Sequence, residues 1–107
     1  MSPTAIANTW RFTPAKDSKE KGAQVDLLFD RKDNAITLCE IKYTNNPFEI
    51  NKSYAAQLNQ KIEVFKKVTK THKNIFLAMI SSNGLKKTMY SEEMVDAVVK
   101  LDDLFNL

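Results

Sequence analysis

The chain has 107 residues, 43% of them hydrophobic, with 16 Lys and Arg against 13 Asp and Glu, a net charge of +3. This length fits one domain, residues 1–107, which can bury roughly 65% of its unfolded surface without a disulfide or a structural metal. The lone Cys39 excludes an internal disulfide and a cysteine-rich zinc site, and the absence of a signal-peptide pattern or a membrane-length apolar run predicts a cytoplasmic protein without a membrane partner.

The N-terminal segment predicts one short strand. Residues 1–8 show no apolar period, and we expect them to be a poorly ordered remnant. Residues 9–13 alternate between polar and apolar side chains and stop before Pro14, which is typical of a short strand. The ordered chain is therefore expected to begin near residue 9.

Residues 23–29 and 35–43 predict a β-hairpin. Strict alternation in the first strand puts its apolar residues on one face and leaves three residues on the other: Gln24, Asp26 and Leu28. The charged residues 30–34 are turn-prone and separate it from the second apolar strand. That second strand carries Glu40 and Lys42 on a single face, because they are two residues apart.

A helix is predicted after the hairpin. Pro47 ends the second strand, and Asn51 or Ser53 can cap a helix that runs to about Lys70. The apolar positions of this segment follow helical spacing: Tyr54, Leu58, Ile62, Phe65 and Val68.

Two further strands complete the predicted fold. Residues 74–80 form a continuous apolar run, as expected for a central strand buried on both faces. Residues 95–101 are the last candidate strand, before a short helical turn over residues 102–105. The order strand, hairpin, helix, strand, strand predicts an α/β fold with a mixed β-sheet and flanking helices.

Three ionisable residues interrupt these apolar strands: Asp26, Glu40 and Lys42. They need partners, because burying an unpaired charge is unfavourable. If the hairpin loop has three residues, 32–34, pairing places Asp26 opposite Glu40 on one face, with Cβ atoms about 5 Å apart. Two carboxylates so close repel unless a cation lies between them, and oxygen ligands suit Mg²⁺ or Mn²⁺. Lys42 shares the face and adds a positive charge, so the set can hydrolyse a phosphodiester.

Residues 22–26 (Gly-Ala-Gln-Val-Asp), taken with residues 40–42 (Glu-Ile-Lys), resemble the motif of the PD-(D/E)XK nuclease superfamily. From residue 22 to about 105 the chain resembles the nuclease-like domain at the C-terminal end of certain bacterial AAA-type ATPases. The resemblance implies a restriction-endonuclease-like core, DNA as substrate and an upstream ATPase domain as partner. It also implies Asp26, Glu40 and the main-chain carbonyl of Ile41 as metal ligands, and Lys42 as the residue that positions the nucleophile.

The same resemblance implies three supporting residues: Gln24, Tyr54 and Gln57. The chain also departs from the superfamily. The acidic ligand that a helix before the first strand usually supplies is missing, since residues 1–8 contain no Asp or Glu, so the N-terminal helix is expected to be truncated. Val25 stands where the motif has proline. The domain could be excised from a longer chain, a neighbouring molecule could supply the helix, as in a homodimer, or the site could be degenerate.

Positive charge concentrates on the predicted helix. Between residues 52 and 73 there are six lysines and one acid, Glu63. Five of these lysines are candidates for binding the phosphates of DNA: Lys52, Lys61, Lys66, Lys67 and Lys70. A solvated helix face is the alternative explanation, because lysine is the common exposed residue of helices.

Simpler interpretations exist for the charged cluster as well. Asp26, Glu40 and Lys42 could form an ion pair on an exposed sheet face, worth about 0.2–1 kcal/mol. Cys39 is expected to be a small buried core residue on the opposite face from Glu40. No glycine-rich phosphate loop is present, so the chain is not itself an ATPase. We therefore predict a magnesium-dependent nuclease-type domain that hydrolyses DNA, with a catalytically inactive nucleic-acid-binding or assembly module of the same fold as the alternative.

Overall fold

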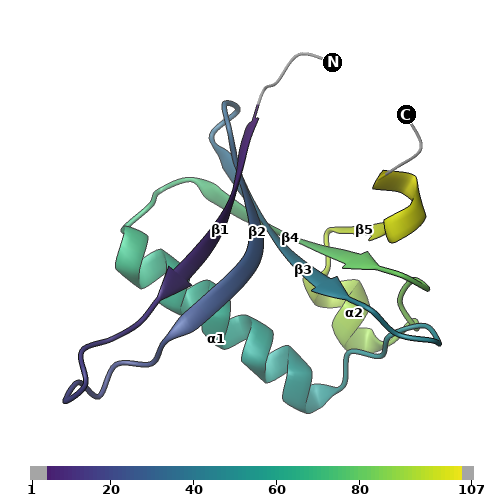
Figure 1. The fold of residues 1–107 in the computed structure, drawn as a ribbon, viewed down its shortest axis with the longest axis horizontal. Coiled ribbons are helices and arrows are strands. Elements are labelled where there is room, and N and C mark those ends of the chain that lie inside the picture. The colour runs from purple at the N-terminus through teal and green to yellow at the C-terminus, as the bar shows by residue number, and fades with distance from the viewer. Residues whose placement is uncertain (1–4, 105–107) are drawn as a thin grey trace.

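The computed structural model describes the backbone of residues 5–104 and the side chains of residues 8–102. The elements follow one another as β1 (Ala5–Phe12), β2 (Ala23–Arg31), β3 (Ala35–Lys42), α1 (Lys52–Thr69), β4 (Asn74–Ser81), α2 (Met89–Met94), β5 (Ala97–Lys100) and a 3₁₀ turn, η1 (Leu101–Leu104). The five strands form one sheet in the order β1-β2-β3-β4-β5 (Figure 1).

The sheet is mixed, as the sequence predicts. β1, β2 and β3 pair antiparallel, whereas β3, β4 and β5 pair parallel. Parallel neighbours need a crossover, and the two helices supply it: α1 connects β3 to β4, and α2 connects β4 to β5 (Figure 1). No helix within residues 5–104 has the length and apolar character that crossing a membrane would require.

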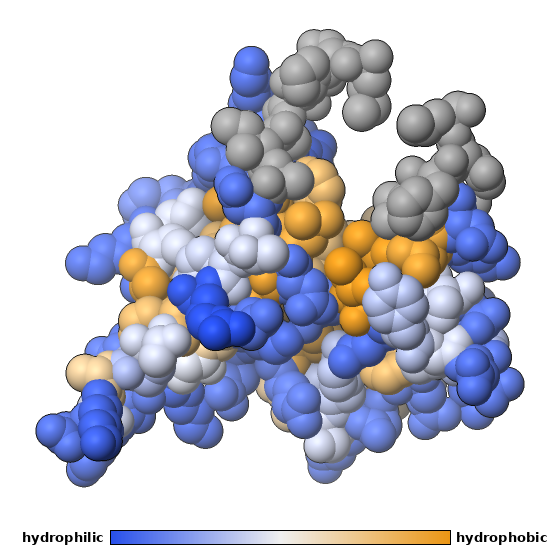
Figure 2. Space-filling view, in the orientation of Figure 1, coloured by the Kyte–Doolittle hydropathy of each residue, from blue (hydrophilic) through white to orange (hydrophobic). Residues whose placement is uncertain are grey.

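The main core lies between the sheet and α1. Apolar side chains of β2, β3 and β4 meet the buried Leu58 and Phe65 of α1, and residues of α2 pack against the same cluster. Trp10 of β1 meets the ring of Phe65 edge to face, with centroids 5.0 Å apart. A smaller cluster around Cys39, Ala78 and Ile80 occupies the other face of the sheet. Both helices thus pack on the main cluster. In Figure 2, hydrophobic residues are visible at the surface in the middle of the view.

α1 has the predicted boundaries. The side chain of Asn51 accepts a hydrogen bond from the Tyr54 amide, and Lys70 ends the helix in the left-handed conformation (φ 54°). Of the apolar positions at helical spacing, Val68 is the most exposed, at 37%.

Other boundaries differ from the predictions. β1 begins at Ala5, so residues 5–8 pair with β2 rather than forming a remnant, and residues 1–4 lie outside the described chain. The strand expected at residues 95–101 is limited to Ala97–Lys100. The short α2 before it was not predicted, although Thr88 and Ser91 form a capping box there. The predicted terminal turn starts at Leu101, and Phe105 lies outside the described residues.

A β-bulge in β2 alters the predicted alternation. Asn8 pairs with Leu28 but Trp10 pairs with Val25, so the single residue between them on β1 faces Asp26 and Leu27 on β2. Val25 and Leu28 therefore both contact the main core, whereas Leu27 packs in the smaller cluster on the other face. The prediction that Val25 and Leu27 share a face is wrong, because strict alternation does not hold across a bulge.

Candidate active site

The predicted hairpin register is confirmed and brings the two acids together. Arg31 pairs with Ala35, which leaves the three-residue loop 32–34, and the ladder continues to the pair Leu27 and Cys39. The next step of this register joins Asp26 to Glu40. At this step the strands are linked by hydrogen bonds between the side chain of one strand and the backbone amide of the other. The bulge in β2 lies at the same position.

Glu40 is a buried acid with partners at both oxygens. The residue is 3% exposed, which contradicts an ion pair on an exposed sheet face. Its Oε2 accepts a hydrogen bond from the Asp26 amide at 3.3 Å. Its Oε1 forms an ion pair with the ammonium of Lys61, which comes from α1. Each oxygen of this carboxylate therefore has one partner, the Asp26 amide from β2 at Oε2 and the Lys61 ammonium from α1 at Oε1.

Asp26 completes the link from the other strand. Its Oδ2 accepts a hydrogen bond from the Ile41 amide at 2.9 Å. In a strand the N–H and C=O of one residue point to the same side, so the Ile41 carbonyl also faces the opening between β2 and β3. The carboxylates of Asp26 and Glu40 and the Ile41 carbonyl thus converge where the ladder opens.

Lys42 is held by two aromatic rings. Its Nζ lies 5.4 Å from the centroid of Phe48 and 4.8 Å from that of Tyr54. The two rings pack edge to face, with centroids 5.0 Å apart. A cation is attracted to the negative face of such rings, so these two contacts favour a position of the ammonium near the end of β3.

The Tyr54 hydroxyl is a buried polar atom without a hydrogen-bond partner among the described residues. Burial, followed by the negative charges of Glu40 and Asp26, raises the pKa of the Tyr54 phenol well above its usual range. The hydroxyl therefore stays protonated at neutral pH. A buried, protonated and unpaired O–H near two carboxylates is a hydrogen-bond donor available to a ligand or a water.

Replacing Tyr54 with phenylalanine is expected to stabilise the domain. An unmade buried hydrogen bond costs about 1–3 kcal/mol, so deleting the hydroxyl should raise the free energy of unfolding by about 1 kcal/mol, or the melting temperature by about 4–8 °C. Thermal unfolding of both proteins measures this. A lower melting temperature for Tyr54→Phe would show that the hydroxyl is already satisfied, for instance by a bound water.

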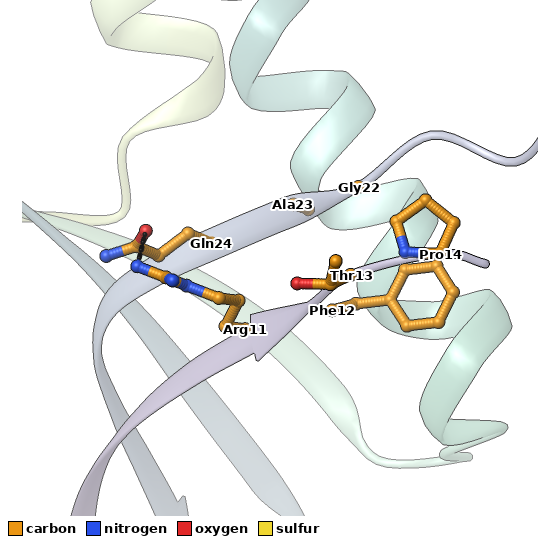
Figure 3. A pocket seen from close by; sticks show the side chains of 7 residues that line it. All are labelled: Arg11, Phe12, Thr13, Pro14, Gly22, Ala23 and Gln24. Carbon is orange, nitrogen blue, oxygen red and sulfur yellow. Dashed lines mark hydrogen bonds between the residues drawn. The ribbon is translucent and has the colours of Figure 1, made fainter. Parts of the chain in front are cut away.

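Two predicted supporting residues are not brought to the carboxylates. Gln24 is exposed and accepts a hydrogen bond from Arg11 at 2.8 Å across the β1–β2 pair. Arg11 and Gln24 line an open hollow of about 390 Å³ at the end of the β1–β2 pair (Figure 3). Thr13, Pro14 and Gly22 line the same hollow. Gln57 is exposed on α1 and makes no hydrogen bond to either carboxylate among the described residues.

The lysines of α1 fall into two groups. Four of the five predicted phosphate-binding lysines are exposed: Lys52, Lys66, Lys67 and Lys70. The fifth, Lys61, is half-buried, and its ammonium forms an ion pair with Glu40. Sequence reasoning missed this role. The available signal was spacing, since Lys61 follows the buried Leu58 by three positions and precedes the buried Phe65 by four.

A divalent cation fits the donors present, with one condition. The described residues contain no cluster of three or more His, Cys, Asp or Glu side chains. Asp26, Glu40 and the Ile41 carbonyl nevertheless offer oxygens in one place, and Mg²⁺ commonly uses one or two carboxylates and keeps several waters. The condition is that the Lys61 ammonium leaves Oε1 of Glu40, so that the cation can bind this oxygen. The unpaired Tyr54 hydroxyl could then bind one of those waters.

Cys39 is confirmed as a buried core residue. It is 3% exposed and packs with Ala78 and Ile80 on the face opposite Glu40. Burial, with a smaller contribution from the charge of Glu40, raises the pKa of its thiol to about 11. The sulfur therefore stays protonated at neutral pH and is a poor nucleophile.

The fold is shared with a solved nuclease. The crystal structure of a repair endonuclease from Pyrococcus abyssi aligns with 91% of this chain at a TM-score of 0.50 and 16% sequence identity. The chain spans 37% of that protein's length. No family model and no curated protein sequence matches the chain. At this identity the likeness shows the fold alone, an α/β nuclease-like fold with a mixed five-stranded sheet and two helices.

Proposed function

We propose that this chain is a nuclease-type domain that hydrolyses DNA phosphodiesters with Mg²⁺ or Mn²⁺. The observation that carries the proposal is the pair of acids at the end of the β2–β3 ladder. The buried Glu40 carboxylate accepts a hydrogen bond from the Asp26 amide, and the Asp26 carboxylate accepts one from the Ile41 amide. The nuclease-like fold supports it. So does the resemblance to PD-(D/E)XK nucleases, from which we also infer an upstream ATPase domain as partner.

Each residue has a distinct role in this proposal. Asp26, Glu40 and the Ile41 carbonyl would hold the cation. When bound, the cation lowers the pKa of a water and offsets charge on the phosphate oxygens. Lys42 orients the attacking hydroxide or stabilises the charge that develops on phosphate, from the position that Phe48 and Tyr54 give its ammonium. The exposed lysines of α1 attract the DNA backbone.

A second function, a binding module without catalysis, is favoured by one observation. Lys61 already neutralises Glu40, so the described structure satisfies this acid without a metal. A domain of this kind would bind DNA through its lysines in the presence of a chelator, with an affinity that falls as salt rises.

Cleavage of single- and double-stranded DNA in Mg²⁺, in Mn²⁺ and in chelator separates the two functions. We expect metal-dependent cleavage by the natural chain and a loss of about 100-fold or more in Glu40→Gln, which keeps the shape of the side chain but removes its charge. A contaminating nuclease would cleave equally in both preparations. DNA binding without cleavage under every metal condition would overturn the catalytic proposal and support the binding module.

A further inference from the structure

The contact between Lys61 and Glu40 occupies the oxygen that a metal would need. Lys61 binds Oε1 of Glu40, and the Asp26 amide binds Oε2. The Glu40 side chain is 4% exposed, so the carboxylate has no solvent-facing side to offer instead. Each oxygen keeps a second lone pair, but a cation bound at Oε1 would meet the positive charge of the Lys61 ammonium on the same atom, so the two compete for it. The Asp26 amide belongs to the backbone of β2, which leaves the Lys61 side chain as the partner that can move.

The space around the ion pair does not admit a metal beside Lys61. The cavity there, bounded by Glu40, Lys61 and apolar residues of β2, β3, β4 and α1, has a volume of about 10 Å³. This is about the room that one water molecule needs. Mg²⁺ binds with several waters of its own, so it cannot simply be added to the pair. Replacement of the ammonium by the cation is therefore the arrangement that this cavity favours.

Lys61 is able to leave without unfolding the helix. Its side chain is 32% exposed, and a lysine has a flexible four-carbon stem that can redirect the ammonium to water while the stem stays packed. The helix itself is held by Leu58 and Phe65, which are 1% and 2% exposed. Movement of the ammonium therefore requires no change in the α1 backbone.

We propose that Lys61 is a tethered counter-ion, which neutralises Glu40 in the metal-free domain and is displaced when a divalent cation binds. This inference rests on the proposed metal site of Asp26 and Glu40. It makes metal affinity a balance between the bound cation and the Lys61 ammonium. The displaced ammonium adds a positive charge at the mouth of the site, so binding of the cation and of a DNA phosphate are linked.

Binding of Mn²⁺, followed by electron paramagnetic resonance, tests the displacement without relying on catalysis. Apparent affinity falls in proportion to the fraction of sites in the competent state, so removing the competing ammonium in Lys61→Met should tighten Mn²⁺ binding about tenfold or more. Mn²⁺ should also raise the melting temperature more in this variant than in the natural chain. Lys73→Met is the matched control, because it removes another lysine–carboxylate pair, with Asp30 at 2.5 Å, and should leave Mn²⁺ binding unchanged.

The outcomes distinguish this inference from the proposed function. Equal or weaker Mn²⁺ binding by folded Lys61→Met, with binding abolished by Glu40→Gln, would overturn the counter-ion role and leave the metal site standing. Absence of Mn²⁺ binding in all variants would overturn the metal site and the inference with it. If circular dichroism shows that Lys61→Met does not fold, Lys61→Gln makes the same comparison with a shorter side chain that is uncharged and keeps a polar end group.

Discussion

Replacing Lys42 with methionine is expected to reduce DNA cleavage by about 100- to 1,000-fold while leaving the domain folded. Loss of one fixed donor aimed at developing charge has an effect of this size. Methionine keeps much of the length and apolar surface that contacts Phe48 and Tyr54, so the variant removes the charge and little of the packing. Single-turnover cleavage with saturating Mg²⁺ measures the chemical step apart from DNA binding.

The control for this experiment is Lys86→Met. Lys86 forms an ion pair with Glu49 at 3.2 Å and its side chain is 65% exposed, so its replacement removes an equal charge from outside the site. It should cleave DNA at the rate of the natural chain. If Lys42→Met also retains that rate, the ammonium has no part in the reaction, and its position between two rings is a matter of packing alone.

The elements that depend on local rules could be predicted from the sequence. Asn51 caps α1 because a side-chain oxygen before an amphipathic segment satisfies a free amide, and the cap and the end at Lys70 lie where spacing predicted them. The three-residue hairpin loop fixes the register, and the register then brings Asp26 to Glu40. This much of the candidate site follows from counting residues between two apolar strands.

The remaining features depend on contacts that no local pattern encodes. The bulge at Asp26 and Leu27 comes from how β1 pairs with β2, two strands separated by a charged loop. The pairing of Lys61 with Glu40 requires knowing which turn of α1 crosses β3, and the sequence displays Lys61 as one lysine among many. Six-residue α2 is too short for a helical period to be distinguished from a loop.

Phe65→Ala is expected to lower the free energy of unfolding by about 3–5 kcal/mol, a large part of the roughly 5–15 kcal/mol typical of a domain. Phe65 is 2% exposed, and its ring meets Trp10 of β1, so truncation empties space where α1 packs against the antiparallel half of the sheet. Urea unfolding measures the loss. Val68→Ala, at a position 37% exposed on the same helix, should change stability by no more than about 0.5 kcal/mol.

The position of Phe65 makes this a test of the site as well as the core. Phe65 follows Lys61 by one helical turn, so its packing sets the distance from α1 to β3 across which Lys61 reaches Glu40. At a temperature low enough to keep Phe65→Ala folded, the Lys61–Glu40 ion pair should be weaker than in the natural chain. Mn²⁺ should then bind to the variant more tightly than to the natural chain. A destabilised variant with unchanged Mn²⁺ affinity would show that the core and the counter-ion are independent, and that Glu40 is held by β2 and β3 alone.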